Sequence, residues 1–117
     1  MTSYTLKQPI PVLQVRDVQE GLDFFCQKLG FGEPWNHEGE YGGASKDGQH
    51  IHFMKKEKPE ASMIYNFVDS ADGIYESVQA AGIEIVSPIA DQFYGMREFT
   101  LKDPSGNFIG YAASLKG

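Results

Sequence analysis

The sequence has a single cysteine, Cys26, among its 117 residues. A lone cysteine cannot form an internal disulfide, which excludes a disulfide-stabilised secreted scaffold and makes the cytoplasm the expected compartment. No apolar run reaches the roughly 18–20 residues that a membrane-spanning helix needs. The N-terminal residues also lack the basic-then-apolar pattern of a signal peptide. We therefore expect no membrane partner.

Basic residues are scarce as well, with 10 Lys and Arg against 16 Asp and Glu and a net charge of −6. Nucleic-acid binding requires a clustered positive surface, so this balance argues against a nucleic-acid partner. What the chain does have is apolar and aromatic content, 41% and 13% of its residues. This composition and length predict one globular domain, residues 1–117, with a single core.

The first half of the chain predicts one strand, one helix and three further strands. Apolar alternation indicates strands at residues 10–15, 31–37, 41–46 and 50–55. Asp17 can cap the intervening helix, with Glu20 as its partner in a capping box, and Gly30 ends it. Asp47-Gly48 predicts the tight turn between the last two strands.

The second half predicts the same order. Strands are expected at residues 63–68, 83–86, 97–101 and 108–111, with residues 87–96 as a loop. Asp69 or Ser70 can cap the helix, and Gly82 ends it. The segment Asp103-Pro-Ser-Gly-Asn107 has strong turn chemistry and predicts a final hairpin.

The two halves therefore read as an internal duplication. Nearly the same interval separates Val15 from Val68, which end equivalent strands, and Gly30 from Gly82, which end equivalent helices. The fold class is α+β, with βαβββ modules at about residues 9–55 and 63–114. A module of this size exposes an apolar sheet face that it cannot bury alone, so the modules must pack together or against a second chain.

Several motifs in this order resemble one known family. They are Val15-Arg-Asp-Val, Phe24-Phe, Leu29-Gly-Phe31, Ala81-Gly-Ile83, Tyr94-Gly-Met-Arg-Glu-Phe99 and the Asp103–Asn107 turn. The chain is similar over most of its length to the vicinal oxygen chelate superfamily of glyoxalases, extradiol dioxygenases and bleomycin-resistance proteins. The last two motifs look most like the bleomycin-resistance branch. The resemblance implies an open, incomplete β-barrel around a cleft, and commonly a homodimer.

The resemblance also implies where a metal would bind, because metal-using members place four ligands on the cleft. The corresponding positions here are Ile10, a position at or near His52, Met63 and Gly110. Isoleucine and glycine have no side-chain donor, and a thioether is a poor ligand for hard divalent ions. We therefore expect no metal cofactor at the inherited site.

The same strand faces carry the candidate ligand-binding residues. If Ile10 and Met63 mark the cleft, alternation adds apolar, aromatic and a few polar side chains, as a small-molecule pocket requires. Loop and strand-end aromatics can stack on a planar ligand, and Arg97 can either clamp an anion or pair with a neighbouring acid. The candidate set is Gln14, Trp35, His52, Met54, Met63, Tyr65, Phe67, Tyr94, Arg97 and Gly110.

We expect a metal-independent small-molecule-binding protein that sequesters an antibiotic or another apolar or aromatic ligand, with no catalytic residues. One alternative is a glyoxalase-like lyase, isomerase or dioxygenase whose metal is held by His50, His52 and an acidic residue such as Glu98 or Asp91. Another is a regulatory module whose cleft faces are buried at a dimer interface.

Overall fold

The computed structural model describes residues 2–116 and folds them into two units of the same design. The first contains strand β1 (Val12–Val15), helix α1 (Val18–Asp23), a π-helical segment η1 (Phe24–Lys28), and strands β2 (Gly32–His37), β3 (Tyr41–Lys46) and β4 (Gln49–Lys55). The second contains β5 (Met63–Phe67), helix α2 (Ala71–Ala80), β6 (Ile85–Asp91), β7 (Met96–Lys102) and β8 (Phe108–Ser114). The repeated order of one strand, one helix and three strands is confirmed.

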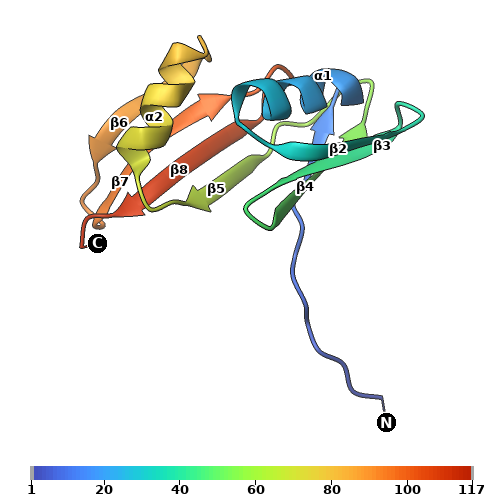
Figure 1. Ribbon diagram of the computed structural model, residues 1–117, viewed down its shortest axis with the longest axis horizontal. Helices are drawn as coiled ribbons and strands as arrows, with labels where there is room; N and C mark the ends of the chain where they lie inside the picture. The colour runs from blue at the N-terminus through green and yellow to red at the C-terminus, as the bar shows by residue number, and fades with distance from the viewer. Residues whose placement is uncertain (1, 117) are drawn as a thin grey trace.

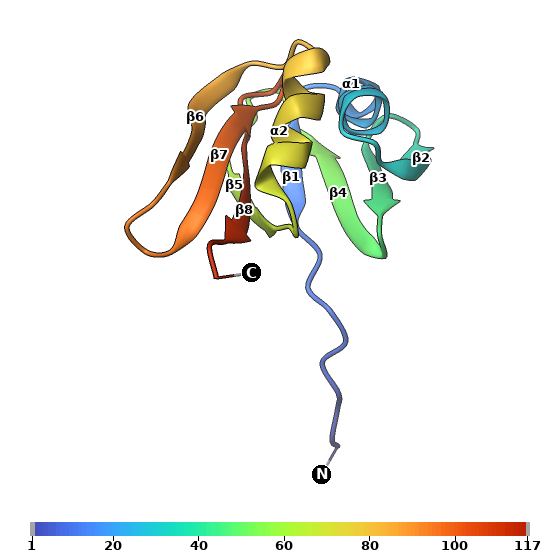
Figure 2. The same ribbon diagram turned by 60° about the vertical axis from the view of Figure 1, so that its left-hand side comes forward.

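Each unit forms one mixed four-stranded sheet. The strand orders are β1-β4-β3-β2 and β5-β8-β7-β6. In each sheet the first strand pairs in parallel with the last, and the other neighbours are antiparallel. The sheets lie side by side and are not closed into a barrel, while residues before β1 extend away from the body (Figures 1 and 2). No helix of residues 2–116 has the length and apolar character to span a membrane.

Both helices begin at a side-chain cap. The Asp17 carboxylate accepts hydrogen bonds from the backbone N–H groups of Gln19 and Glu20, and the Ser70 hydroxyl accepts one from Gly73. The predicted capping box is wrong, because the Glu20 carboxylate instead accepts two hydrogen bonds from the Arg16 guanidinium, at 2.7 and 2.8 Å. This exposed pair raises the pKa of Arg16 and lowers that of Glu20.

Strand β6 corrects the sequence prediction. It spans Ile85–Asp91, whereas the sequence predicts a strand at residues 83–86 and a loop from 87 to 96. The strand contains Pro88, and proline lacks the N–H that a central strand needs. Here β6 is the edge strand of its sheet, and its pairing with β7 contains register shifts, so a proline is accommodated.

The turn before β8 joins the two units. Asn107 is fully buried, and its side-chain amide donates to the backbone oxygen of Gln14 in β1 and to the Asp103 carboxylate, both at 3.0 Å. Its side-chain oxygen accepts a hydrogen bond from the Ser62 N–H at 2.9 Å. One apolar core continues from Leu13 and Phe53 in the first unit to Phe99 and Ile109 in the second. The turn therefore fixes the position of β1 relative to the second sheet.

Candidate functional site

The first candidate surface is the side of the first sheet that faces away from α1, which we call face A. On β4, Ile51 and Phe53 are buried toward the core, so His52 and Met54 between them lie on the opposite side. Strand pairing places Val12 and Gly43 beside His52, and Trp35 beside Gly43. Face A carries Val12, Gln14, Trp35, Tyr41, Gly43, His52 and Met54.

Three aromatic rings form a cluster on face A. The ring of His52 lies 5.2 Å from that of Trp35 and 5.3 Å from that of Tyr41, in edge-to-face contact with both. The Tyr41 hydroxyl and His52 Nδ1 are 2.9 Å apart, within hydrogen-bond distance. The indole nevertheless remains 42% exposed. The cluster is thus held in place from within the sheet while one side of it stays open.

Glycine makes this cluster possible. A Cβ atom on Gly43 would lie only 2.8 Å from the Trp35 ring and 2.9 Å from the His52 ring. On Gly42, it would lie 2.7 Å from both the Trp35 backbone oxygen and the Val18 side chain. Both glycines are therefore required by close packing on β3, on opposite sides of the strand. The sequence contains this Gly-Gly pair, but its packing role was not predicted.

The second candidate surface, face B, is the side of the second sheet that faces away from α2. Phe99, Leu101, Ile109 and Tyr111 point toward the core, which leaves the alternate positions on the other side. Face B carries Met63, Tyr65, Phe67, Glu98, Gly110 and Ala112. Phe67 is 75% and Met63 57% exposed, which is unusual for large apolar side chains on a sheet.

Small residues on β8 let one side chain cross face B. Tyr65 and Met63 lie over Gly110, where an added Cβ would approach both at 3.3 Å. The Tyr65 hydroxyl donates a hydrogen bond of 2.5 Å to the Glu98 carboxylate on β7. The space over Gly110, one of the candidate ligand-binding residues, is therefore occupied by these two side chains. The sequence suggested Glu98 only as a metal ligand, but its carboxylate instead accepts the hydrogen bond from Tyr65.

The Glu98 carboxylate also sets the electrostatics of face B. Its hydrogen bond raises the pKa of Tyr65 to about 12, because removing the hydroxyl proton would leave two negative charges in contact. Interaction with the same carboxylate raises the pKa of Tyr94, at the turn between β6 and β7. Both tyrosines therefore remain protonated at neutral pH, and the Tyr65 hydroxyl proton stays engaged with the Glu98 carboxylate.

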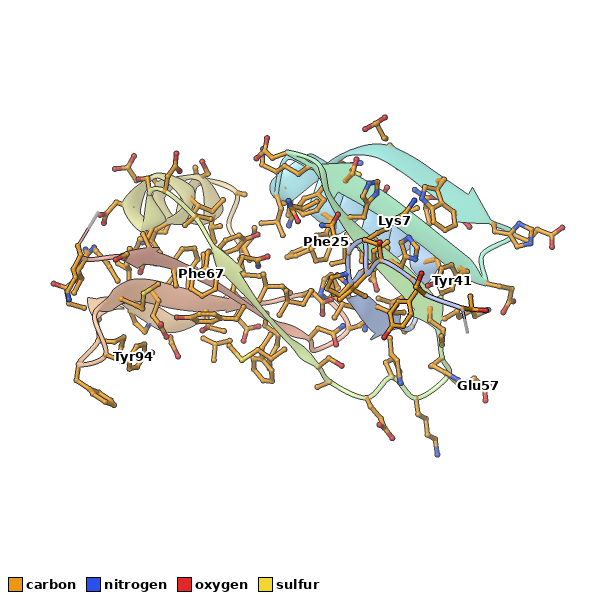
Figure 3. The ribbon with its side chains drawn as sticks, turned by 90° about the horizontal axis from the view of Figure 1, so that it is seen from below. Lys7, Phe25, Tyr41, Glu57, Phe67 and Tyr94 are labelled. Carbon is orange, nitrogen blue, oxygen red and sulfur yellow. The ribbon has the colours of Figure 1, made fainter. Side chains whose placement is uncertain are left out.

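The candidate residues from the sequence thus fall into two groups on two sheets. Gln14, Trp35, His52 and Met54 lie on face A, and Met63, Tyr65, Phe67 and Gly110 lie on face B, with Tyr94 beside it. Seen from below in Figure 3, Tyr41 lies on one unit, and Phe67 and Tyr94 on the other. Within the described part of one chain, the two groups therefore lie on separate sheets and not on one continuous strand face.

Arg97 lies apart from both groups. Its guanidinium donates to the Asp72 carboxylate of α2 at 3.1 Å and to Asp91 of β6 at 2.9 Å. Both carboxylates raise the pKa of Arg97, with Asp72 contributing more. Of the two roles that the sequence left open, the structure shows pairing with neighbouring acids, on the side of β7 opposite Glu98.

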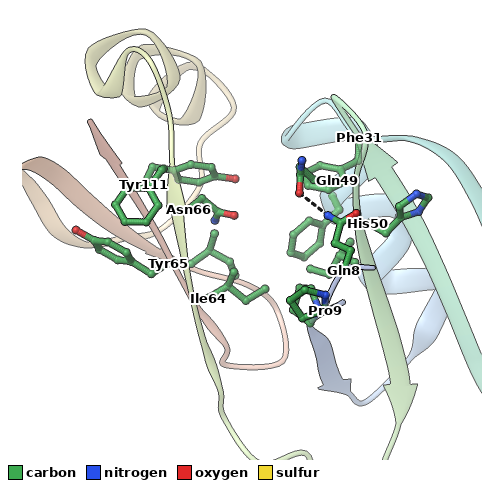
Figure 4. Close-up of a pocket in the computed structure, with 14 residues that line it drawn as sticks. Gln8, Pro9, Phe31, Gln49, His50, Ile64, Tyr65, Asn66 and Tyr111 are labelled. Atoms are coloured by element: carbon green, nitrogen blue, oxygen red, sulfur yellow. Dashed lines mark hydrogen bonds between the residues drawn. The ribbon is translucent and has the colours of Figure 1, made fainter. Parts of the chain in front are cut away.

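Two adjoining hollows lie between the units, away from the aromatic cluster of face A. One, of about 420 Å³, lies between Ile64, Asn66 and Tyr111 on one unit and Phe31 and Gln49 on the other (Figure 4). The other, of about 610 Å³, continues toward α2 along Asp69 and Ser70. Trp35, Tyr41 and His52 line neither hollow. Two of the predicted site residues, Tyr65 and Phe67, also line the first hollow, and Phe67 lines the second. The sequence did not predict the hollows themselves, because they depend on how the two units pack together.

The donor atoms that a family metal would need are not assembled. Among residues 2–116, no three His, Cys, Asp or Glu side chains are grouped so that they could hold a metal ion. Three of the inherited ligand positions hold Ile10, Met63 and Gly110, and His52 Nδ1 is engaged with Tyr41. The acidic third ligand that a site built on His50 and His52 requires is not beside them. The described residues of a single chain therefore do not fit the family metal.

Comparison with known proteins identifies the family. Residues 7–111 match the model of the Glyoxalase/Bleomycin resistance protein/Dioxygenase superfamily, and the chain belongs to this family. It is 25% identical over 130 residues to a bleomycin resistance protein of Geobacillus stearothermophilus, covering 93% of this chain and 98% of that protein. The same identity and coverage are found for a Staphylococcus aureus bleomycin resistance protein. These relatives support the bleomycin-resistance-like branch.

Solved structures share the fold. The bleomycin-binding protein of Streptomyces verticillus, complexed with copper(II)-bleomycin, superposes with a TM-score of 0.78 at 22% identity, covering 96% of this chain and 99% of that one. A lactoylglutathione lyase from Agrobacterium tumefaciens superposes with a TM-score of 0.80 at 12% identity, covering 95% and 96%. A binding protein and an enzyme thus have the same architecture, so function must be argued from the residues of the site.

Proposed function

We propose that this protein binds and sequesters a planar aromatic small molecule without a metal of its own, and that bleomycin is the first ligand to test. The observation that carries the proposal is the aromatic cluster of Trp35, Tyr41 and His52, fixed against Gly43 with the indole partly open. Rigid, half-exposed aromatic rings stack on planar ligands at little entropic cost. Sequestration requires only such a surface and no reacting group.

The similarity to known proteins supports a small-molecule ligand. Family membership and bleomycin-resistance relatives support a small-molecule-binding role, and the Streptomyces verticillus protein has this fold with copper(II)-bleomycin bound. No catalytic step is proposed, because the donor set for the family metal is not present among the described residues. Any metal in the complex would enter as part of the ligand.

The binding cleft would form between two copies of the chain. Face A and face B are each an open, largely apolar surface, and exposed apolar patches rimmed by polar residues mark interaction sites. Pairing face A of one chain with face B of another would bring the aromatic side chains of both faces, Trp35 and Phe67 among them, to one cleft that could enclose a ligand. We therefore propose a homodimer with two such clefts. Sedimentation equilibrium should give the dimer mass, and a monomer at micromolar concentration would contradict this part of the proposal.

Calorimetric titration tests the function. Chelator-treated protein is titrated with metal-free bleomycin and with copper(II)-bleomycin, and we expect about one molecule bound per chain. Replacing an anchoring tryptophan commonly costs about 2 kcal/mol or more, so Trp35→Ala should weaken binding at least about tenfold. Tyr4→Ala is the matched control, because Tyr4 is an exposed aromatic residue on the N-terminal arm, away from both sheets.

Three results of these titrations would each contradict a different part of the proposal. Equal affinity in wild type and Trp35→Ala would show that the aromatic cluster is not the binding surface. No heat of binding with either form of bleomycin would remove bleomycin as the ligand. Binding that is abolished by chelation of the protein and restored by added zinc, nickel or iron would contradict metal independence.

A further inference from the structure

Glu98 is a carboxylate placed in the middle of an aromatic surface. It is half-buried on β7, and cross-strand pairing puts it next to Ala112, with Phe67 on the far side of Ala112. Because Ala112 is small and fully buried, nothing at that position rises between the carboxylate and the Phe67 ring. Tyr65, which pairs with Gly110 two residues before Ala112, donates its 2.5 Å hydrogen bond to the Glu98 carboxylate. The carboxylate is thereby held in one position.

No cationic side chain neutralises this carboxylate. Within residues 2–116, Glu98 has no Lys, Arg or His partner within ion-pair distance. Arg97, its sequence neighbour, lies on the other side of the strand and is bound by Asp72 and Asp91. Lys102, the cationic side chain on the same side of β7, lies with its ammonium 5.6 Å from the Phe108 ring centre. The negative charge on face B is therefore not compensated by any of the described residues.

Three exposed aromatic side chains lie on the same part of face B as this charge. Tyr65 and Phe67 are in edge-to-face contact at 5.4 Å, and both are well exposed. Tyr94 is half-exposed and close enough to Glu98 for the carboxylate to perturb its ionisation. A carboxylate accepts several hydrogen bonds, so the tyrosine bond leaves acceptor sites on Glu98 for a ligand. An ammonium group bound to the carboxylate would lie beside these aromatic side chains.

We propose that Glu98, Tyr65, Phe67 and Tyr94 form a subsite for a primary alkylammonium group carried by the aromatic ligand. This inference rests on the proposed small-molecule-binding function and specifies the charge of its ligand. The carboxylate supplies a charge-assisted acceptor, and the rings supply cation–π attraction. A single carboxylate with aromatic neighbours does not suit a divalent metal ion, which needs several oxygen or nitrogen ligands. An anionic ligand group would be repelled.

Two small probes of nearly the same shape test the subsite. 1-Naphthylmethylamine is a cation at pH 7, and 1-naphthalenemethanol replaces its ammonium with a hydroxyl group. Dissociation constants are measured by ligand-observed NMR for the wild type, Glu98→Gln and the control Glu76→Gln. Gln keeps the shape and an acceptor for Tyr65 but removes the charge. Glu76 is exposed on α2, which covers the opposite side of the sheet.

We expect the wild type and Glu76→Gln to prefer the cationic probe by about fivefold or more. In Glu98→Gln the preference should disappear while the affinity for the neutral probe stays the same, which also shows that the face is still folded. The wild-type preference should shrink between 50 mM and 500 mM salt, because screening weakens an exposed charge contact. This salt series tests the subsite even if the variant does not fold.

The results distinguish the subsite from the function on which it rests. Binding of both probes with no charge preference, or a preference that survives in Glu98→Gln, overturns the ammonium subsite and leaves the aromatic surface in place. A wild-type preference that does not change with salt also overturns it. Failure of both probes to bind the wild type overturns the aromatic binding surface and the subsite together.

Discussion

Replacing Asn107 with alanine should destabilise the protein strongly, because this buried side chain connects the two units. Three hydrogen bonds would be lost, to Gln14, Asp103 and Ser62. At about 1 kcal/mol for each bond, and more for partners left buried and unpaired, the free energy of unfolding should fall by about 3 kcal/mol. A domain of this size has a total stability of roughly 5–15 kcal/mol, so the loss is a large fraction of it.

Urea denaturation followed by far-ultraviolet circular dichroism measures this loss. The midpoint should decrease while the slope stays the same, since the surface exposed on unfolding hardly changes. Asn36→Ala is the control, because Asn36 is exposed and bonds only to Gln19 and to the turn at Gly39. A loss below about 1 kcal/mol for Asn107→Ala, similar to the control, would refute the assignment of the turn as the joint between the units.

Three further predictions concern the sheets. Gly43→Ala should displace the Trp35 ring, shift its fluorescence spectrum and weaken bleomycin binding at least about tenfold. An unchanged spectrum would contradict the close packing of the Trp35 ring against Gly43. Burial raises the pKa of Tyr111 to about 12, so the free energy of unfolding should fall by about 3 kcal/mol at most as pH rises from 10 to 12. In urea titrations at these pH values, the free energy of unfolding of Tyr111→Phe should fall less than that of the wild type. Arg97→Gln should leave bleomycin affinity within about twofold of wild type, because Arg97 is bound by Asp72 and Asp91; a larger loss would place Arg97 in the ligand site.

Local sequence signals predicted most of the fold. Side-chain caps at Asp17 and Ser70 and the turn at residues 103–107 have causes within a few residues, so they are readable in sequence. The length of β6 was not readable, because whether Pro88 can stand in a strand depends on the strand being at the edge of its sheet. That is a property of the whole sheet.

The site was predicted less completely than the fold. Strand alternation correctly indicated which residues share a face with His52 and with Tyr65, because the side-chain period of a strand is fixed. The contact between Tyr65 and Glu98 spans three strands, and the role of Gly43 depends on the ring that packs over it. Contacts of this kind follow from register and packing, so a single sequence does not contain a local signal for them.

The central claim is that the ligand binds against the aromatic cluster of face A and not in the hollows between the units. Trp35 is the only tryptophan of the chain, so its indole N–H gives a single tryptophan signal in a nitrogen-15 NMR spectrum. The side-chain amide of Asn66, which lines both hollows, gives a second, independent signal. On addition of bleomycin, the indole signal should shift with the binding curve seen by calorimetry. An unchanged indole signal with a shifted Asn66 amide would contradict the claim.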